Sequence, residues 1–405
     1  MSLTFAWRYL RSKKSTNAIN IIAWISMVAI GVVTAALVVV LSVFNGFEDL
    51  VKRMYGDFYA DLEVTARQGI WMYPEDGTWE KLKNIPGVLG VCPVVEQRAI
   101  LLDQDDKSIV WLKGVEPDYA DHTGLVHNMV RGIFDVGDSA APRLVIGVGV
   151  EHSLKIIAGQ TPFPITVYLP NPDAGPSADA LTAMVSANAY PGGSFAVQQE
   201  FDDQYAFTHI GFLRYMQGIE QGACTAIEIF LAPGASMTQV QKKVQQVMGS
   251  DLLVKNRYEQ DQALFAAMKT EKLIIYAIAF LILIIAGFNI VSSLTMTVIE
   301  KQKDIAVLRA MGASDGVIYR IFLQLGILLA SLGAAAGFII GLVICLGQQK
   351  FHWIKLGGQS FIIDHYPVAV QVSDLLTIGG IVTCMALLAA WLPSRRAANA
   401  YYSLR

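Results

Sequence analysis

The residues that could carry chemistry in this sequence are few, and none of them forms a catalytic pattern. There is no phosphate-binding loop (GxxxxGK followed by Ser or Thr), no HExxH and no GxSxG. The six histidines are scattered, and the nearest pair, His122 and His127, is spaced i, i+5, which does not place two metal ligands on one helix face. We therefore expect no catalytic residue, no metal site and no cofactor bound by this chain.

The segments of the chain that would have to support any other function are mostly apolar. The chain of 405 residues is 54% hydrophobic and 16% charged, against about 25% charged residues in soluble domains. The apolar residues gather in four blocks without a charged side chain, at residues 19–44, 273–299, 321–346 and 375–392. Each is near or above the roughly 20 residues that a helix needs to cross a bilayer, so we predict four transmembrane helices. Without ionisable residues inside the spans, an ion-driven carrier or an intramembrane protease is disfavoured.

Two of these blocks allow another interpretation. The fourth is the shortest, bracketed by Asp374 and Pro393, and alone could be a buried soluble helix. The first could be a signal peptide, but it exceeds the 7–15 apolar residues of a signal sequence, and no small-x-small cleavage site follows it. We interpret both as retained spans.

The distribution of basic residues predicts the orientation. The segments before the first span, between the second and third, and after the fourth hold 11 basic residues and three acidic ones. The stretch from residue 46 to residue 271 holds 17 basic and 29 acidic residues. Because basic residues stay in the cytoplasm, we expect cytoplasmic termini and a large domain on the opposite side of the membrane, which is called the periplasmic domain below.

The predicted fold is four transmembrane α-helices with a large periplasmic α+β domain between the first and second spans. In that domain, two βαβ-like units would begin with strands at residues 61–65 and 226–231, and Ser236 and Gln239 would form a capping box for a helix before a strand at 251–258. A β-rich subdomain would be inserted at about 115–209, with strands at 143–147 and 165–169 and a protruding turn-rich loop at 170–179. The predicted organisation is a cytoplasmic interfacial helix (1–18), first span (19–44), periplasmic domain (45–271), second span (272–299), coupling helix (300–320), third span (321–346), periplasmic loop (347–374), fourth span (375–392) and cytoplasmic tail (393–405).

Small residues and cysteines leave alternatives open. Gly333, Gly337 and Gly341 form two overlapping GxxxG motifs, which suit either packing within the chain or a partner interface. Cys92 and Cys224 could pair in the periplasmic domain, but two unpaired buried thiols are favoured.

The most specific stretch lies between the second and third spans and reads EKQKDIAVLRAMGAS. A charged helix with Ile305, Leu308 and Met311 on one apolar side would end at Gly312. This stretch resembles the permease subunits of the FtsX/MacB-type ABC superfamily, particularly the lipoprotein-releasing (Lol) branch. FAWRYLRSKK, VVLSVFNGFED, WLKGVEP and LPSRRAANAYYSLR carry the resemblance through the whole chain, although the family's proline-containing ending is altered at Tyr401 to Leu404.

The resemblance implies an inner-membrane permease that passes outer-leaflet lipoproteins to a periplasmic carrier. Its periplasmic domain would combine porter-like βαβ units with the inserted β-rich subdomain. Its partners would be two cytosolic ABC ATPase subunits, which bind the ATP, and a second permease copy or paralogue. The ATPase-coupling residues would be Glu300, Lys301, Lys303, Asp304, Ile305, Leu308, Arg309, Met311, Gly312 and Ala313. The lipoprotein cavity would be lined by Val39, Val40, Val43, Phe44, Phe265, Met268 and Ile275. A carrier-recruiting loop would contain Pro170, Asn171, Pro172 and Asp173.

Two other functions fit the same superfamily. A mechanotransmission permease would control an external partner such as a cell-wall hydrolase. The third hypothesis, an efflux permease, is weakened because such permeases usually carry a fused ATPase domain, and this sequence contains no phosphate-binding loop.

Overall fold

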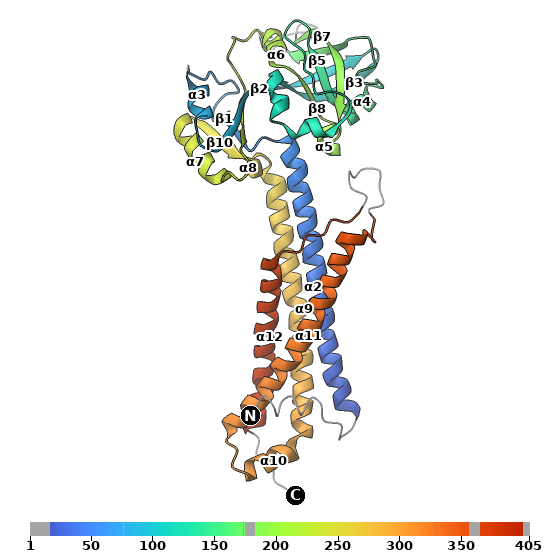
Figure 1. Cartoon of the computed structure of the whole chain (residues 1–405), viewed down its shortest axis with the longest axis vertical. Coiled ribbons are helices and arrows are strands. Elements are labelled where there is room, and N and C mark those ends of the chain that lie inside the picture. The colour runs from blue at the N-terminus through green and yellow to red at the C-terminus, as the bar shows by residue number, and fades with distance from the viewer. Residues whose placement is uncertain (1–16, 76, 173, 175–182, 356–364, 400–405) are drawn as a thin grey trace. The chain divides into compact units, whose positions relative to one another are not determined.

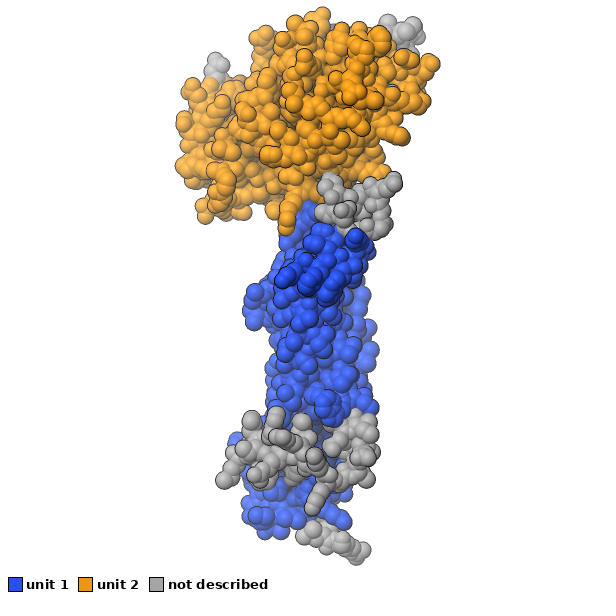
Figure 2. Space-filling model, turned by 45° about the vertical axis from the view of Figure 1, so that its right-hand side comes forward, with its two compact units in different colours: residues 1–50, 267–357, 363–405 blue, residues 51–266, 358–362 orange. Residues whose placement is uncertain are grey.

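The computed structural model describes residues 17–75, 77–172, 174, 183–355 and 365–399. The described residues form two compact units, coloured blue and orange in Figure 2. We call the first the membrane bundle; it holds the described residues up to Leu50 and those after residue 266. The second is the extramembrane domain, Val51–Ala266. The predicted interfacial helix lies outside the described residues except for its last two positions, as do Tyr401 to Leu404.

Four long helices form the bundle: α2 (Asn17–Phe58), α9 (Gln262–Glu300), α11 (Asp315–Phe351) and α12 (Val372–Asn399) (Figure 1). Among the described residues, these four are long and apolar enough to span a membrane, as the four blocks predict. The helices are longer than the blocks, and α2 and α9 continue into the extramembrane domain. Pro393 does not end the fourth helix as predicted. It is buried within α12, where packing compensates for the one backbone hydrogen bond that a proline removes.

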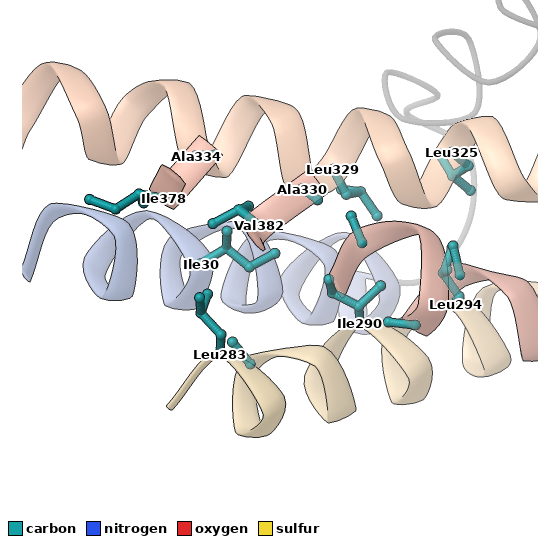
Figure 3. Packing of buried hydrophobic residues seen from close by; sticks show 14 of the residues in the cluster. Ile30, Leu283, Ile290, Leu294, Leu325, Leu329, Ala330, Ala334, Ile378 and Val382 are labelled. Atoms are coloured by element: carbon teal, nitrogen blue, oxygen red, sulfur yellow. The ribbon is translucent and has the colours of Figure 1, made fainter. Parts of the chain in front are cut away.

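Branched and small side chains from all four helices fill the bundle interior. Figure 3 shows Ile30 of α2, Leu283 of α9, Leu329 of α11 and Val382 of α12 converging on one cluster, and each is at most 5% exposed. Helix association in lipid depends on such close packing, because lipid tails are as apolar as the side chains.

The glycine stripe of α11 packs against α2 of the same chain. A Cβ at Gly337 would lie 2.4 Å from the carbonyl oxygen of Gly31, and one at Gly333 would lie 2.5 Å from that of Met27. At Gly341 the nearest atom would be Val38 Cβ, at 2.8 Å. The two backbones approach so closely that only glycine fits, which identifies packing within the chain as a role of the GxxxG motifs.

The extramembrane domain is built on one ten-stranded sheet with the order β10-β1-β9-β2-β3-β8-β5-β7-β4, and β6 pairs with β2 and β7. The strands are β1 (Leu62–Ala66), β2 (Val88–Asp103), β3 (Asp106–Val115), β4 (Met129–Gly132), β5 (Arg143–Gly147), β6 (Ile165–Pro170), β7 (Met184–Phe195), β8 (Tyr205–His209), β9 (Ala226–Leu231) and β10 (Leu252–Asn256). The short helices are α3 (Thr78–Lys83), η1 (Pro117–Asp121), η2 (Gly124–Asn128), α4 (Val148–Ser153), α5 (Gln199–Asp202), α6 (Ile210–Gln217), α7 (Met237–Met248) and α8 (Arg257–Gln260).

The two predicted βαβ-like units combine into one layer. Strand β1 lies between β9 and β10, and β9 pairs with the first half of β2, so both ends of the domain share a sheet. The prediction of a capping box at Ser236 is wrong, since the Ser236 side chain makes no capping hydrogen bond. A capping box forms instead at Asn256 and Glu259, where the strand predicted to reach residue 258 ends and α8 begins.

The inserted β-rich part begins earlier than residue 115. From Val95 onward β2 leaves β9 and pairs with β3, through a two-residue turn that places Gln104 at φ 52°. Strand β2 therefore belongs to both parts of the domain and joins them covalently. Cys92 and Cys224 are both buried and unpaired, as favoured from the sequence.

Candidate functional site

The predicted coupling segment forms a helix–turn between two spans. The short helix α10 (Gln302–Ala310) follows α9 directly, and α11 starts at Asp315. The turn is made at Gly312, whose φ of 91° is a left-handed conformation that favours glycine. Its N–H donates to the Arg309 carbonyl (2.8 Å), and the Ala313 N–H donates to the Leu308 carbonyl (3.0 Å). The predicted break at Gly312 is therefore confirmed.

The apolar side predicted for this segment is divided between interior and surface. Ile305 is 1% exposed and packs into the bundle core, whereas Met311 is 78% exposed. Leu308 is half-buried, and Val307, which the sequence analysis did not select, is 49% exposed. The prediction of one shared face is wrong, because α10 uses Ile305 to hold itself against the bundle. Met311 and Val307 are the apolar side chains it presents.

Charged groups fix the same segment in place. Lys301 Nζ lies 3.2 Å from the Asp304 carboxylate, and Lys303 is exposed, while Glu300 ends α9. Arg309 Nη2 donates to the Asp315 carboxylate at 2.9 Å and also to the backbone carbonyl of Ala398, near the end of α12. One guanidinium thus ties α10 to the beginning of one span and the end of another.

The residues predicted to line a lipoprotein cavity do not share one surface. Val39 and Val43 line a pocket between α2 and α11, and Val40 is 47% exposed. Phe44 lies toward α9, since the Lys272 ammonium is 5.9 Å from its ring centroid.

The α9 members of that set are also divided. Phe265 packs inside the extramembrane domain, with its ring 5.0 Å from that of Tyr258. Met268 and Ile275 are half-buried, and Ile275 contacts the bundle core.

The predicted carrier-recruiting loop leaves a β-hairpin. Strand β6 ends at Pro170 opposite Met184 of β7, and the Asn171 N–H donates to the Ala183 carbonyl at 2.9 Å. The carbonyl of Pro170 accepts a hydrogen bond from Gln217 of α6 (2.9 Å). Pro172 is exposed, and Asp173 lies outside the described residues. The base of the loop is therefore fixed to the sheet and to one helix.

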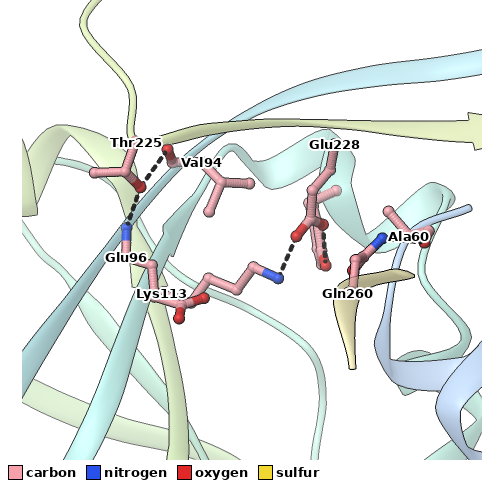
Figure 4. Close-up of polar contacts among 8 residues, drawn as sticks. Ala60, Val94, Glu96, Lys113, Thr225, Glu228 and Gln260 are labelled. Atoms are coloured by element: carbon pink, nitrogen blue, oxygen red, sulfur yellow. Dashed lines mark hydrogen bonds and ion pairs between the residues drawn. The ribbon is translucent and has the colours of Figure 1, made fainter. Parts of the chain in front are cut away.

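A buried charge cluster in the extramembrane domain escaped the sequence analysis. Lys113 Nζ donates to Glu228 at 2.5 Å (Figure 4). The Tyr119 hydroxyl donates to the other Glu228 oxygen at 2.9 Å. All three residues are at most 2% exposed. Two more carboxylates are close, because Glu63 is the cross-strand partner of Glu228 and Glu96 that of Lys113. The pattern that could have revealed it is one charged residue inside each of two apolar strands, VWLKGV and AIEIFL.

The cluster holds more carboxylates than cations, which shifts several pKa values. Burial, reinforced by Glu228, raises the pKa of Glu63 from 4.5 to about 7, and burial also raises that of Glu96. Burial alone would lower the pKa of Lys113, but the adjacent Glu228 carboxylate outweighs it, and the pKa is raised. The lysine therefore stays charged while the outer carboxylates accept protons readily.

We expect the extramembrane domain to lose stability as the pH rises from about 4.5 to about 7. The folded state binds a proton at Glu63 in this range and the unfolded state does not. The stabilisation by this proton is therefore complete below pH 4.5, decreases between pH 4.5 and about 7, and is lost above the raised pKa. Urea unfolding of the full chain in mild detergent across this range would measure the slope, and Glu63→Gln should reduce it. An equal slope in the variant would contradict the assignment.

A second polar cluster lies within the bundle, at the end where α2 and α9 continue into the extramembrane domain. Asn45 of α2 donates to the Asp374 carboxylate of α12 at 2.6 Å, and Tyr276 of α9 donates to its other oxygen at 3.0 Å. Lys272 Nζ donates to Asn45 (3.0 Å) and to Glu48 (3.2 Å). Asp374, interpreted from the sequence as a flanking residue, is only 7% exposed and joins three helices.

Comparison with known proteins agrees with this architecture. Residues 23–247 match the model of the MacB-like periplasmic core domain, and residues 276–401 match that of the FtsX-like permease C-terminal region. The chain is 26% identical to the lipoprotein-releasing system transmembrane protein LolC of Neisseria meningitidis, over 97% of this chain and 96% of that protein. It is 24% identical to LolE of Haemophilus influenzae, with the same two coverages.

Among solved structures, the periplasmic region of MacB from Actinobacillus actinomycetemcomitans matches at a TM-score of 0.34 and 10% identity, over 53% of this chain and 97% of that one. The first family model covers the first span and most of the extramembrane domain, and the second covers the C-terminal group of three spans. The model of the MacB-like periplasmic core domain covers more than half of the sequence. This chain therefore belongs to the family with a MacB-like periplasmic core domain and an FtsX-like permease C-terminal region.

Proposed function

We propose that this chain is a permease subunit of an ABC transporter that extracts lipoproteins from the outer leaflet of the inner membrane and passes them to a periplasmic carrier. The observation that carries the proposal is similarity over nearly the full length to both LolC and LolE, which are named for lipoprotein release. The similarity includes the spans, the extramembrane domain and the segment between the second and third spans.

The chemistry of extraction requires an external energy source. Moving an acyl chain out of the bilayer costs about 0.8 kcal/mol for each buried methylene. The sequence contains no phosphate-binding loop, so we place ATP binding and hydrolysis in two separate cytosolic subunits. A second permease copy or a paralogue would complete the complex, with both termini of this chain in the cytoplasm.

In this proposal α10 is the element on which the ATPase acts. Its exposed Met311 and Val307 would contact the ATPase, and Ile305 would transfer the movement to the bundle because it is packed in the core. Arg309 would be a positioning residue, since it links the turn to α11 and α12. In the extramembrane domain, the loop that contains Pro170, Asn171 and Pro172 would help to recruit the carrier.

Depletion of the protein tests the function directly. Outer-membrane lipoproteins should accumulate in the inner membrane, which sucrose-gradient fractionation and immunoblotting would detect. Normal lipoprotein sorting accompanied by wall or division defects would instead indicate the mechanotransmission alternative and overturn the proposal.

We expect Arg309→Ala to uncouple ATP hydrolysis from transport. Losing a hydrogen bond made by a charged group such as the Arg309 guanidinium corresponds to roughly a tenfold change in an equilibrium constant. We therefore expect the amount of lipoprotein released per ATP hydrolysed to decrease roughly tenfold. The matched control is Arg320→Ala, which removes an exposed arginine from the same connection. Lipoprotein release and ATP hydrolysis can both be measured with the complex reconstituted in proteoliposomes. An equal amount of lipoprotein released per ATP hydrolysed in the two variants would refute this role of Arg309.

A further inference from the structure

The membrane bundle contains an apolar pocket that is lined by Val39 and Val43 but by none of the other residues predicted for the lipoprotein cavity. Its volume is about 280 Å³, and it lies between α2 and α11. The side chains that line it include Val39, Val43, Ile344, Cys345, Ile354 and Val368. On both helices these residues fall in the last turns of the apolar blocks, at the depth of acyl chains in the leaflet on the side of the extramembrane domain.

The surface of the pocket is almost entirely apolar. Gln348, its one amide side chain, donates through Nε2 to the carbonyls of Ile354 (2.9 Å) and Tyr366 (3.3 Å). Its Oε1 accepts from the Ile354 N–H (2.9 Å). A cavity lined in this way holds no ordered water and binds apolar molecules.

The wall of the pocket is held in place rather than loosely folded over it. The segment Tyr366–Ala369 crosses α2 at Gly46, where a Cβ would lie 2.4 Å from Pro367. The Ala369 N–H donates to the Ser42 carbonyl (2.8 Å), and Gln349 donates to the Val368 carbonyl (2.7 Å). These three contacts hold the wall of the pocket against α2 and α11.

We propose that this pocket binds one acyl chain of a phospholipid from the surrounding leaflet. A cavity of about 150 Å³ binds benzene, so a volume of this size accommodates roughly ten to twelve carbons, which is the greater part of one phospholipid acyl chain. A triacylated lipoprotein would need to place three chains, whereas a phospholipid can insert one and leave the other in the bilayer. The neighbouring Val40 and Val343 do not line the pocket and are 47% and 61% exposed on the outside of the bundle.

Photolabelling tests this assignment on the full-length chain in nanodiscs. The probe is phosphatidylethanolamine with a diazirine near the end of one acyl chain, and adducts are located by mass spectrometry after detergent washing. We expect adducts at Val39, Val43 and Cys345 that saturate at one lipid per chain. Val39→Phe, which fills the pocket, should reduce them roughly tenfold, because excluding about two methylenes costs one order of magnitude in affinity. Val343→Phe, on the exposed face of α11, is the matched control and should change nothing.

Other outcomes would overturn the proposal. They are adducts that do not saturate, adducts distributed equally over exposed and pocket residues, and labelling only by a triacylated lipopeptide that carries the same diazirine. If Val39→Phe does not fold, two measurements still test the proposal. They are the saturation of adducts in the unmodified chain and the effect of Val43→Phe on the number of adducts. The result is independent of lipoprotein sorting, so a failure here leaves the proposed function intact, and the reverse also holds.

Discussion

Replacing Lys113 with methionine is expected to lower the free energy of unfolding of the extramembrane domain by about 3–5 kcal/mol, the cost of breaking a buried ion pair by removing one partner. The variant would leave Glu228 buried, opposite Glu63 and without a cation. The hydroxyl of Tyr119 would be the remaining donor to its carboxylate among the contacts described above.

Pulse proteolysis of the full chain in mild detergent, at increasing urea concentration, would measure this loss. Lys107→Met is the matched control, because Lys107 is exposed on the same strand and should change stability little. The double variant Lys113→Met with Glu228→Gln should recover most of the loss, since no charge is then left unpaired. A double variant as unstable as the single one would show that packing of the lysine stem, not charge, is responsible.

Gly337→Leu is expected to destabilise the membrane bundle by at least about 3 kcal/mol, at the upper end of overpacking penalties. The added side chain would begin 2.4 Å from the Gly31 carbonyl oxygen and 2.7 Å from Thr34 Cβ. Because the first contact is with backbone, no rotamer change can relieve it, and α2 must move away from α11.

The buried Cys345 offers a direct measurement of this separation. Its rate of modification by a maleimide, determined by peptide mapping, should increase strongly in the Gly337 variant. Gly380→Leu is the control, because a Cβ at Gly380 meets nothing within 4 Å. Protection of Cys345 that is unchanged by Gly337→Leu would show that the α2–α11 contact is dispensable.

The parts of the fold that follow from local pattern could be predicted from the sequence. The length of the apolar blocks predicts the spans, and the spacing of apolar residues predicts the strand at 226–231 and the helix after Ser236. The structure confirms all of these elements. The break at Gly312 follows from the conformational freedom of one residue. None of these features depends on a distant part of the chain.

What could not be predicted depends on partners far apart in the sequence. Lys113 and Glu228 are 115 residues apart, and Asn45 and Asp374 are 329 apart, so no local pattern connects them. Ile305 seemed suitable for a surface ridge because the bundle that buries it was not known. The same limit applies to Val39 and Val40, adjacent residues that lie on different sides of one helix.

Strand β2 has a consequence for the order of events during synthesis. Its second half can pair with β3 at once, since the hairpin turn lies between Asp103 and Asp106. Its first half pairs with β9, where Val94 meets Ala226, so that edge remains open while 132 more residues are made. At about 5–20 residues per second this interval is on the order of ten seconds. A half-paired apolar strand is thus exposed for far longer than a hairpin takes to form, and the nascent domain is a candidate client for chaperones at this stage.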